Sequence, residues 1–311
     1  MDRNISIDIL KISLAIFVVF LHTALFFDFS KELSFILVNG VFRIAVPTFL
    51  IITGYYFFLI TDLKKFLKWL SRVAILFLIW NLFYLPFWYK PELKSLLFNA
   101  INGYFVLWYL SGTALAGCML FLVKNVKSLY LVLASLLIYI LGWLAQEAGN
   151  MHLFSGGVDK LLNSTPFHRN FFFICFPFLT LGYLINKHHV YLSKFKININ
   201  LVLLLSSLLI IESYLNYMFI STTEGLDQLL MLFLVVPALF IFVLNLEIKG
   251  KTKNLASLST GIFLIHPLFL FLFRQIIPNH QNTLISICVL LSSVIAGLIL
   301  VLLNKRLKYI L

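Results

Sequence analysis

Long apolar runs separated by short polar segments are the most regular feature of the chain. A helix that crosses a bilayer needs about 20 mostly apolar residues, and ten runs approach or exceed that length. They lie at residues 9–27, 40–60, 73–88, 103–123, 129–145, 170–185, 199–217, 229–246, 255–273 and 284–303. The pattern predicts an all-α, polytopic integral membrane protein with about ten transmembrane helices, folded as a single domain over residues 1–311.

The composition of the chain leads to the same class. Of its 311 residues, 61% are hydrophobic and 12% are charged, whereas soluble domains are about 45–50% apolar and about 25% charged. A soluble protein of this size has too little interior to bury so much apolar surface. Disordered chains are poor in apolar and aromatic residues. The composition therefore excludes both of these classes.

The basic residues are distributed unevenly about the predicted spans. The chain has 24 Lys and Arg against 12 Asp and Glu, an excess that in a soluble protein would suggest a nucleic-acid partner. With alternating spans, 17 of the 24 fall on the side of the N-terminus, 6 fall on the other side and Arg43 lies within the second run. Cytoplasmic loops are enriched in Lys and Arg. We therefore expect both termini in the cytoplasm, a location in the cell (cytoplasmic) membrane, and no nucleic-acid partner.

Ionisable residues within the apolar runs are the first candidates for function, because burying them in lipid is costly. Lys11 and His22 are 11 residues apart, which is about three helical turns and about 16 Å along the axis. They therefore share one helix face, with Asp8 one turn below Lys11. Arg43 lies in the second run at a depth similar to that of His22, and its permanent charge favours a polar cavity over lipid.

A basic cluster precedes the third run, where the apolar pattern predicts a cytoplasmic loop. Its members are Lys64, Lys65, Lys68 and Arg72. The cluster fits two roles: it orients the helices, or it binds phosphate groups or anionic lipid headgroups.

Four further residues are candidates for a substrate pocket: Trp108, Tyr109, Glu212 and His266. Each has an ordinary structural alternative. Trp and Tyr near a helix end are typical of the interfacial aromatic belt, an acid near a helix end can face water, and a histidine can be part of the packed core. The spacing of the three cysteines matches no metal site, and we expect no bound metal.

Several of these segments resemble motifs of the membrane-bound acyltransferase-3 family. Asp8-Ile-Leu-Lys11 followed by His22 resembles the family's first-helix signature, in which ten residues separate a basic residue from a histidine. The other matching segments, in chain order, are Phe42-Arg43-Ile-Ala-Val-Pro47-Thr-Phe49 with Gly54 (Thr53 replaces the usual Ser), Leu107-Trp108-Tyr109-Leu110, and Ser259-Thr-Gly261-Ile-Phe-Leu-Ile-His266. One departure concerns Arg-x-x-Arg after the second helix: if Arg72 is the second Arg, Trp69 occupies the first position, next to Lys68.

The resemblance implies O-acylation of sugars and cell-envelope polymers. Acetyl-CoA or another acyl-CoA would be the donor substrate, with no permanently bound cofactor, and a glycan or other envelope component would be the acceptor in a setting of membrane lipid. The expected roles are catalysis for His22 and Arg43, donor binding for Lys11, Lys68 and Arg72, and substrate contact for Asp8, Trp108, Tyr109, Glu212 and His266.

Two questions stay open from the sequence. His22 can act as a general base or as a covalent acyl carrier. A transporter or flippase for a lipid-linked glycan is the alternative to the enzyme, because buried charges among many spans also suit a transport path. Consumption of the acyl-CoA thioester distinguishes the two functions.

Overall fold

The computed structural model describes residues 3–192, 197–250, 254–278 and 280–311. Lys194, Lys196, Lys251 and Lys253, which the topology prediction assigns to the cytoplasmic side, lie outside these residues. The larger helices are α1 Ser6–Thr23, α2 Lys31–Asn39, α3 Ala45–Phe57, α4 Leu63–Phe83, α6 Leu93–Asn102, α7 Trp108–Val123, α8 Ser128–Asn150, α11 Phe176–Lys187, α13 Ile199–Phe219, α14 Leu232–Leu244, α15 Asn254–Ile276 and α16 Asn282–Leu303. The smaller elements are β1 Arg3–Asn4, η1 Val41–Ile44, α5 Leu85–Trp88, η2 Phe105–Leu107, α9 Gly156–Leu162, α10 Thr165–His168, η3 Phe171–Cys175, α12 His189–Leu192 and β2 Lys249–Gly250.

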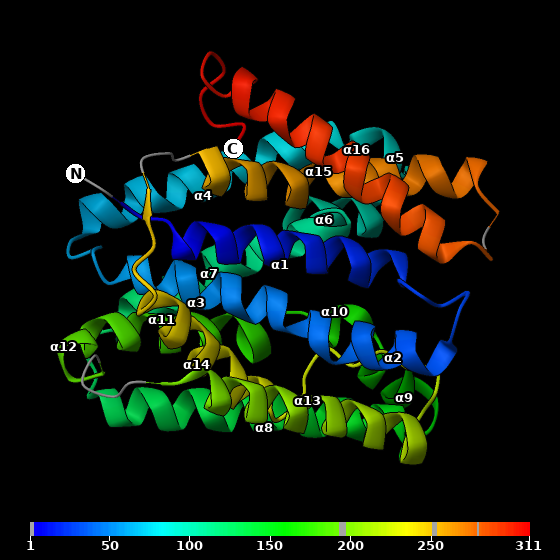
Figure 1. Ribbon diagram of the computed structural model, residues 1–311, viewed down its shortest axis with the longest axis horizontal. Helices are drawn as coiled ribbons and strands as arrows, with labels where there is room; N and C mark the ends of the chain where they lie inside the picture. The colour runs from blue at the N-terminus through cyan, green and yellow to red at the C-terminus, as the bar shows by residue number, and fades with distance from the viewer. Residues whose placement is uncertain (1–2, 193–196, 251–253, 279) are drawn as a thin grey trace.

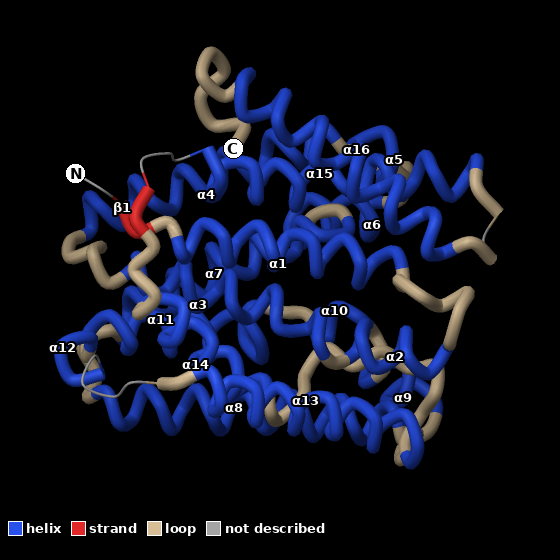
Figure 2. Tube along the Cα trace, viewed as in Figure 1, coloured by secondary structure: helices blue, strands red, loops and turns tan. Residues whose placement is uncertain are grey.

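The predicted class is confirmed. Within the described residues, nine helical segments are long and apolar enough to cross a membrane, and the two strands are a single two-residue antiparallel pair. The long helices run side by side along the long axis of the molecule (Figures 1 and 2), and β1 and the C-terminus lie in the same half of the view. Helix α1 lies centrally between α3 and the pair α15–α16.

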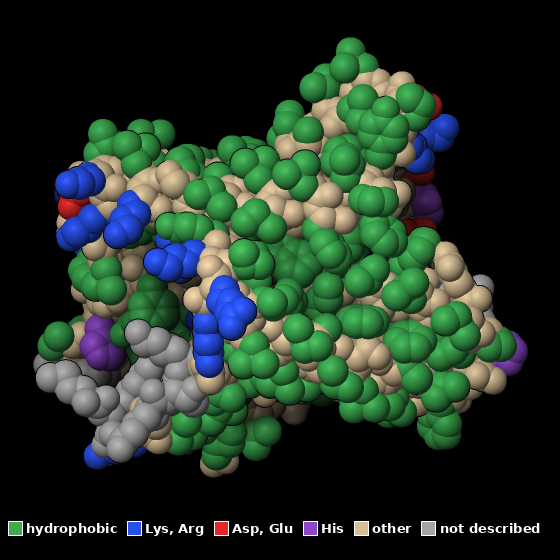
Figure 3. Space-filling model, turned by 90° about the horizontal axis from the view of Figure 1, so that it is seen from above, with side chains coloured by type: hydrophobic (Ala, Val, Ile, Leu, Met, Phe, Trp, Pro, Cys, Tyr) green, Lys and Arg blue, Asp and Glu red, His purple; other side chains and the backbone are tan. Residues whose placement is uncertain are grey.

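The outer surface of the bundle is suited to lipid. Large apolar side chains are widely exposed, among them Leu122 at 81% and Phe219 at 79%. Figure 3 shows hydrophobic side chains over most of one face, with Lys and Arg gathered towards the end that holds β1 and the start of α4. This gathering is in accord with the predicted cytoplasmic end, which stays a prediction.

Two predicted boundaries differ from the structure. The second span extends from Lys31 to Phe57, because Ser30 accepts the N–H of Leu33 and caps a helix that starts well before Gly40. The segment between the predicted spans 129–145 and 170–185 is largely helical, since the end of α8, α9 and α10 lie within it.

The predicted span 229–246 is a shorter helix than expected. Helix α14 has 13 residues, a length of about 20 Å, which is less than the apolar core of a bilayer. The residues between Phe219 and Leu232 instead form a loop that folds back into the molecule. This loop contributes directly to the candidate site described below.

Close packing of α3 against α11 depends on two glycines. A Cβ atom on Gly54 would lie 1.9 Å from the carbonyl oxygen of Leu179, and one on Gly182 would lie 2.1 Å from that of Ile51. Both obstructing atoms belong to the backbone, so no side-chain rotation relieves the clash. Small residues that let backbones approach are typical of helix contacts in membranes.

We expect Gly54→Ala to destabilise the protein by about 1–3 kcal/mol or more, because α3 and α11 must move apart to accept the methyl group. The matched control is Gly157→Ala in α9, where a Cβ meets nothing within 4 Å. Thermal unfolding of both variants in detergent measures the difference. Equal melting temperatures for the two variants would contradict this account of the packing.

Candidate active site

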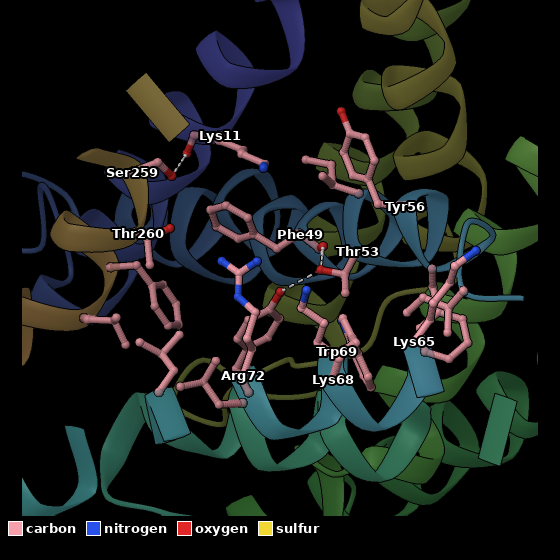
Figure 4. A pocket seen from close by; sticks show the side chains of 18 residues that line it. Lys11, Phe49, Thr53, Tyr56, Lys65, Lys68, Trp69, Arg72, Ser259 and Thr260 are labelled. Carbon is pink, nitrogen blue, oxygen red and sulfur yellow. Dashed lines mark hydrogen bonds between the residues drawn. The ribbon is translucent and has the colours of Figure 1, made fainter. Parts of the chain in front are cut away.

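A cavity of about 510 Å³ opens among α1, α3, α4, α7 and α15. Its charged lining residues are Lys11, Lys65, Lys68 and Arg72, and we call it the basic cavity. Figure 4 shows Lys68 and Arg72 reaching from α4 towards Lys11, which enters from α1 on the opposite wall. The basic side chains that α4 contributes are exposed, so this wall of the cavity is accessible from outside the protein.

The basic cluster on α4 is helical, and the prediction of a loop there is wrong. Asp62 accepts the N–H of Lys65 at 2.8 Å and caps the helix at its first residue. This backbone bond lowers the pKa of Asp62 below its usual value. Positions three or four apart share a helix face, which is why Lys65, Lys68 and Arg72 all line the cavity.

A second cavity, of about 40 Å³, lies near the other end of α1. Its polar lining residues are His22, Arg43, Trp108, Arg169 and Asp227, and we call it the histidine cavity. Lys11 lines the basic cavity and His22 lines this one, so a single face of α1 reaches both. The two positions are about 16 Å apart along the helix.

A break in the second span directs Arg43 inwards. Helix α2 ends at Asn39, a 3₁₀ turn follows, and Pro47 in the first turn of α3 has no N–H to donate to the carbonyl of Arg43. The Arg43 side chain is 9% exposed. Its Nη1 pairs with the carboxylate of Asp227, and its Nη2 donates to Asn39 Oδ1 at 3.0 Å.

Asp227 joins two arginines in the histidine cavity. Arg169 Nε donates to Asp227 Oδ1 at 2.8 Å, and the same oxygen accepts the Arg43 bond. Burial opposes ionisation of this carboxyl, but the two guanidinium groups hold the pKa of Asp227 below its usual value. The carboxylate is therefore charged at neutral pH and fixes the positions of both arginines.

The loop that carries Asp227 is held in place by buried amide side chains. Gln146 Oε1 accepts the backbone N–H groups of Asp227 at 2.7 Å and Gln228 at 2.9 Å. Asn39 Oδ1 accepts the N–H of Leu226 at 3.1 Å. Because α2, α8 and this loop meet at these bonds, the carboxylate has a well-defined position beside Arg43.

Three aromatic rings pack together in the lining of the basic cavity. Phe49, Tyr109 and Phe263 line the basic cavity, with ring centroids 5.5–6.3 Å apart; we call these three rings the aromatic cluster. The ring centroids of His266 and Phe263 are 6.2 Å apart, and His266 stacks on His22 with a centroid distance of 5.5 Å. His266 Nδ1 is 2.8 Å from the Phe263 carbonyl oxygen, and its buried Nε2 has no hydrogen-bond partner among the described residues.

The structure brings together eight of the ten predicted site residues. Lys11, Lys68, Arg72 and Tyr109 line the basic cavity, His22, Arg43 and Trp108 line the histidine cavity, and His266 stacks on His22.

The other two predicted residues, Asp8 and Glu212, line neither cavity. Asp8 is 1% exposed. Glu212 accepts the backbone N–H groups of Leu230 at 2.6 Å and Met231 at 2.9 Å. Glu212 belongs to α13, and its carboxylate lies beside the start of α14. There it accepts hydrogen bonds from two backbone amides just before that helix begins.

Sequence reasoning missed Arg169 and Asp227. Both lie in polar segments between apolar runs, where charged residues are ordinary. Arg169 is one of the 6 basic residues that the topology prediction assigns to the side opposite the N-terminus. Nothing in the local pattern indicates that these two residues meet Arg43 and His22, because that meeting depends on how the loops fold back.

Comparison with known proteins identifies the family. The family described as an acyltransferase domain (acyltransferase-3) matches residues 4–303. The chain therefore belongs to the acyltransferase-3 family and is a multi-pass membrane protein. No solved structure gives a significant match.

Two curated relatives carry other names. The chain is 24% identical to an "Amino-acid racemase" of Enterococcus faecalis and 28% identical to a "Serine/alanine racemase" of Enterococcus gallinarum. In each case the match covers 98% of this chain and 47% of the relative. The chain thus spans about half the length of the curated relatives it matches.

Proposed function

We propose that the protein is an integral membrane O-acyltransferase of the cell membrane. It moves an acyl group, acetyl in the simplest case, from cytoplasmic acyl-CoA to a hydroxyl of a polysaccharide or other cell-envelope glycan. One observation carries the proposal: a single face of α1 reaches from a basic cavity to a cavity lined by His22. Family membership supplies the reaction class.

The basic cavity suits the donor. Its volume of about 510 Å³ lies within the range of ordinary ligand pockets. CoA carries several phosphate groups, which form charge-assisted hydrogen bonds with Lys and Arg. Lys68 and Arg72 from α4, facing Lys11 from α1, supply such cations. In this arrangement the headgroup binds between the two helices and the thioester points towards the aromatic cluster.

The chemistry follows from the polar groups around His22. The acceptor hydroxyl oxygen attacks the thioester carbonyl carbon, the carbon–sulfur bond breaks, and the CoA thiolate takes up a proton. As a general base, His22 accepts the hydroxyl proton, while Arg43 stabilises the oxyanion or orients the acceptor. As a carrier, His22 takes the acyl group on a ring nitrogen and then passes it to the hydroxyl. Both routes give the same ester.

The alternative function is a transporter or flippase for a lipid-linked glycan. It would move its substrate past the buried charges without consuming a thioester. The racemase names of the two relatives describe proteins about twice as long as the matched region. We therefore carry no racemase activity over to this chain.

The proposal is tested with purified protein and acetyl-CoA labelled in its acetyl group. We expect thioester consumption and transfer of label to envelope glycans. Lys68→Gln should raise KM for acetyl-CoA about tenfold, the loss of about 1.4 kcal/mol of binding, with a smaller change in kcat because a phosphate contact is remote from the carbonyl.

The control variant is Lys160→Gln, which removes an exposed positive charge from α9, far along the chain from α4. Its KM should equal that of the wild type. If the wild-type protein leaves the thioester intact, the protein is not an acyltransferase and the transporter or flippase is the function to test. If Lys68→Gln and Lys160→Gln have the same KM, the basic cavity is not the donor site.

A further inference from the structure

The histidine cavity has a net positive charge. Arg43, Arg169 and Asp227 line it, and Arg274 donates to the backbone carbonyl of His22 at 3.2 Å at the same end of α1. Two guanidinium groups in the cavity therefore share a single carboxylate, and a third contacts the backbone of His22. An excess of positive charge in a partly buried site attracts anions more strongly than it would in water.

Some guanidinium N–H groups of the cavity take no part in the ion pairs with Asp227. Arg43 is 9% exposed, and its Nε has no hydrogen-bond partner among the described residues. Arg169 donates to Asp227 through Nε, so its two Nη groups lie outside that bond. A buried donor without an acceptor is costly, and the planar guanidinium group matches carboxylate and phosphate oxygens.

The size of the cavity restricts what reaches these donors. Its volume is about 40 Å³, which is small beside the roughly 300–1,000 Å³ of a pocket that holds a whole ligand. The cavity therefore suits one small group of a larger ligand. His22 lines the same cavity, so a group held there lies close to the imidazole.

We propose that the histidine cavity is an anion subsite for the acceptor. A carboxylate or phosphate group of the acceptor binds Arg169 and Arg43, and this brings a hydroxyl of the same molecule to His22. Asp227 holds the two guanidinium groups in position before the acceptor arrives. The inference rests on the proposed acyl transfer and adds the chemical class of the acceptor: a hydroxyl compound with a nearby anionic group.

The test uses three small acceptors with the same carbon chain: glycerol, glycerate and glycerol 3-phosphate. The full chain in lipid nanodiscs is supplied with labelled acetyl-CoA, and kcat/KM is measured for each acceptor. We expect glycerate or glycerol 3-phosphate to exceed glycerol by about tenfold or more, as expected for a charge-assisted hydrogen bond. The two anionic acceptors distinguish a carboxylate from a phosphate subsite.

Variants of Arg169 test whether the preference for anionic over neutral acceptors arises in the histidine cavity. Arg169→Gln should reduce the ratio of anionic to neutral acceptor about tenfold, mainly through KM, and Arg169→Lys should retain part of it. Lys160→Gln on exposed α9 should leave the ratio unchanged. Equal use of glycerol and the anionic acceptors by the wild type, or a ratio that Arg169→Gln does not alter, would overturn the anion subsite.

A competition experiment decides the case in which none of the three acceptors is acetylated. In membranes that contain the natural acceptor, glycerate or glycerol 3-phosphate should inhibit label incorporation competitively, and glycerol should not. No inhibition by either anion overturns the subsite while the acyltransferase function stands. No thioester consumption in these membranes overturns the proposed function itself, and the subsite with it.

Discussion

Replacing His22 by Ala is expected to lower acyl transfer by about 10²–10⁴-fold, the usual contribution of a positioned acid–base group. His22 lines the cavity that also holds Arg43, and its imidazole stacks on His266 at 5.5 Å. Without the imidazole, no group at this position accepts the hydroxyl proton or carries the acyl group. The measurement is the transfer of label from acetyl-CoA to envelope glycans.

The His22→Ala experiment needs a folding control, and His280→Ala provides one. His280 is exposed, so its loss should change neither transfer nor thermal unfolding. Incubating the wild type with labelled acetyl-CoA and no acceptor separates the two roles of His22: a carrier leaves label on the protein, and a general base does not. Near-normal transfer by a folded His22→Ala protein would remove His22 from the mechanism.

Asp227→Asn is expected to destabilise the folded protein by about 3–5 kcal/mol, because removal of one partner leaves a buried charge uncompensated. Arg43 is only 9% exposed and depends on this carboxylate. Arg169 is 23% exposed and can turn towards water more easily. Unfolding in detergent, followed by tryptophan fluorescence, measures the free energy of unfolding.

A double variant shows whether the ion pair between Arg43 and Asp227 accounts for the loss of stability. Arg43→Gln with Asp227→Asn removes both charges, so its free energy of unfolding should fall less than the sum of the two single changes. A difference of about 1 kcal/mol or more would demonstrate the coupling. If Asp227→Asn unfolds like the wild type, the ion pair does not hold the loop between α13 and α14 in place.

Much of the fold follows from local patterns. Apolar run length predicts helices at the right places because each spanning helix must satisfy its own backbone hydrogen bonds in lipid. The errors are at ends and interruptions: Asp62 starts α4 within a supposed loop, and α14, the first of the three spans after residue 220, begins only after a folded-back segment. Caps and re-entering loops depend on single polar residues that a window of hydropathy does not resolve.

The candidate site, like the fold, is only partly predictable from local patterns. The spacing of Lys11 and His22 is enough to place them on one face, because the helical repeat is a property of the backbone. Lys68 and Arg72 share a face for the same reason once α4 is known to be helical. Glu212 drew attention as an acid in an apolar run, yet its carboxylate satisfies backbone amides.

The apolar runs, the basic residues between them and the helical spacing of Lys11 and His22 are sufficient to define a polytopic protein with charged groups on one inner face, since these are local or compositional properties. Only the tertiary structure decided which residues share a cavity. Arg169 and Asp227 are 58 positions apart in the chain, and Asp227 lies 184 positions from Arg43. Their meeting beside His22 depends on the packing of separate helices and on a folded-back loop, and no local pattern encodes either of these.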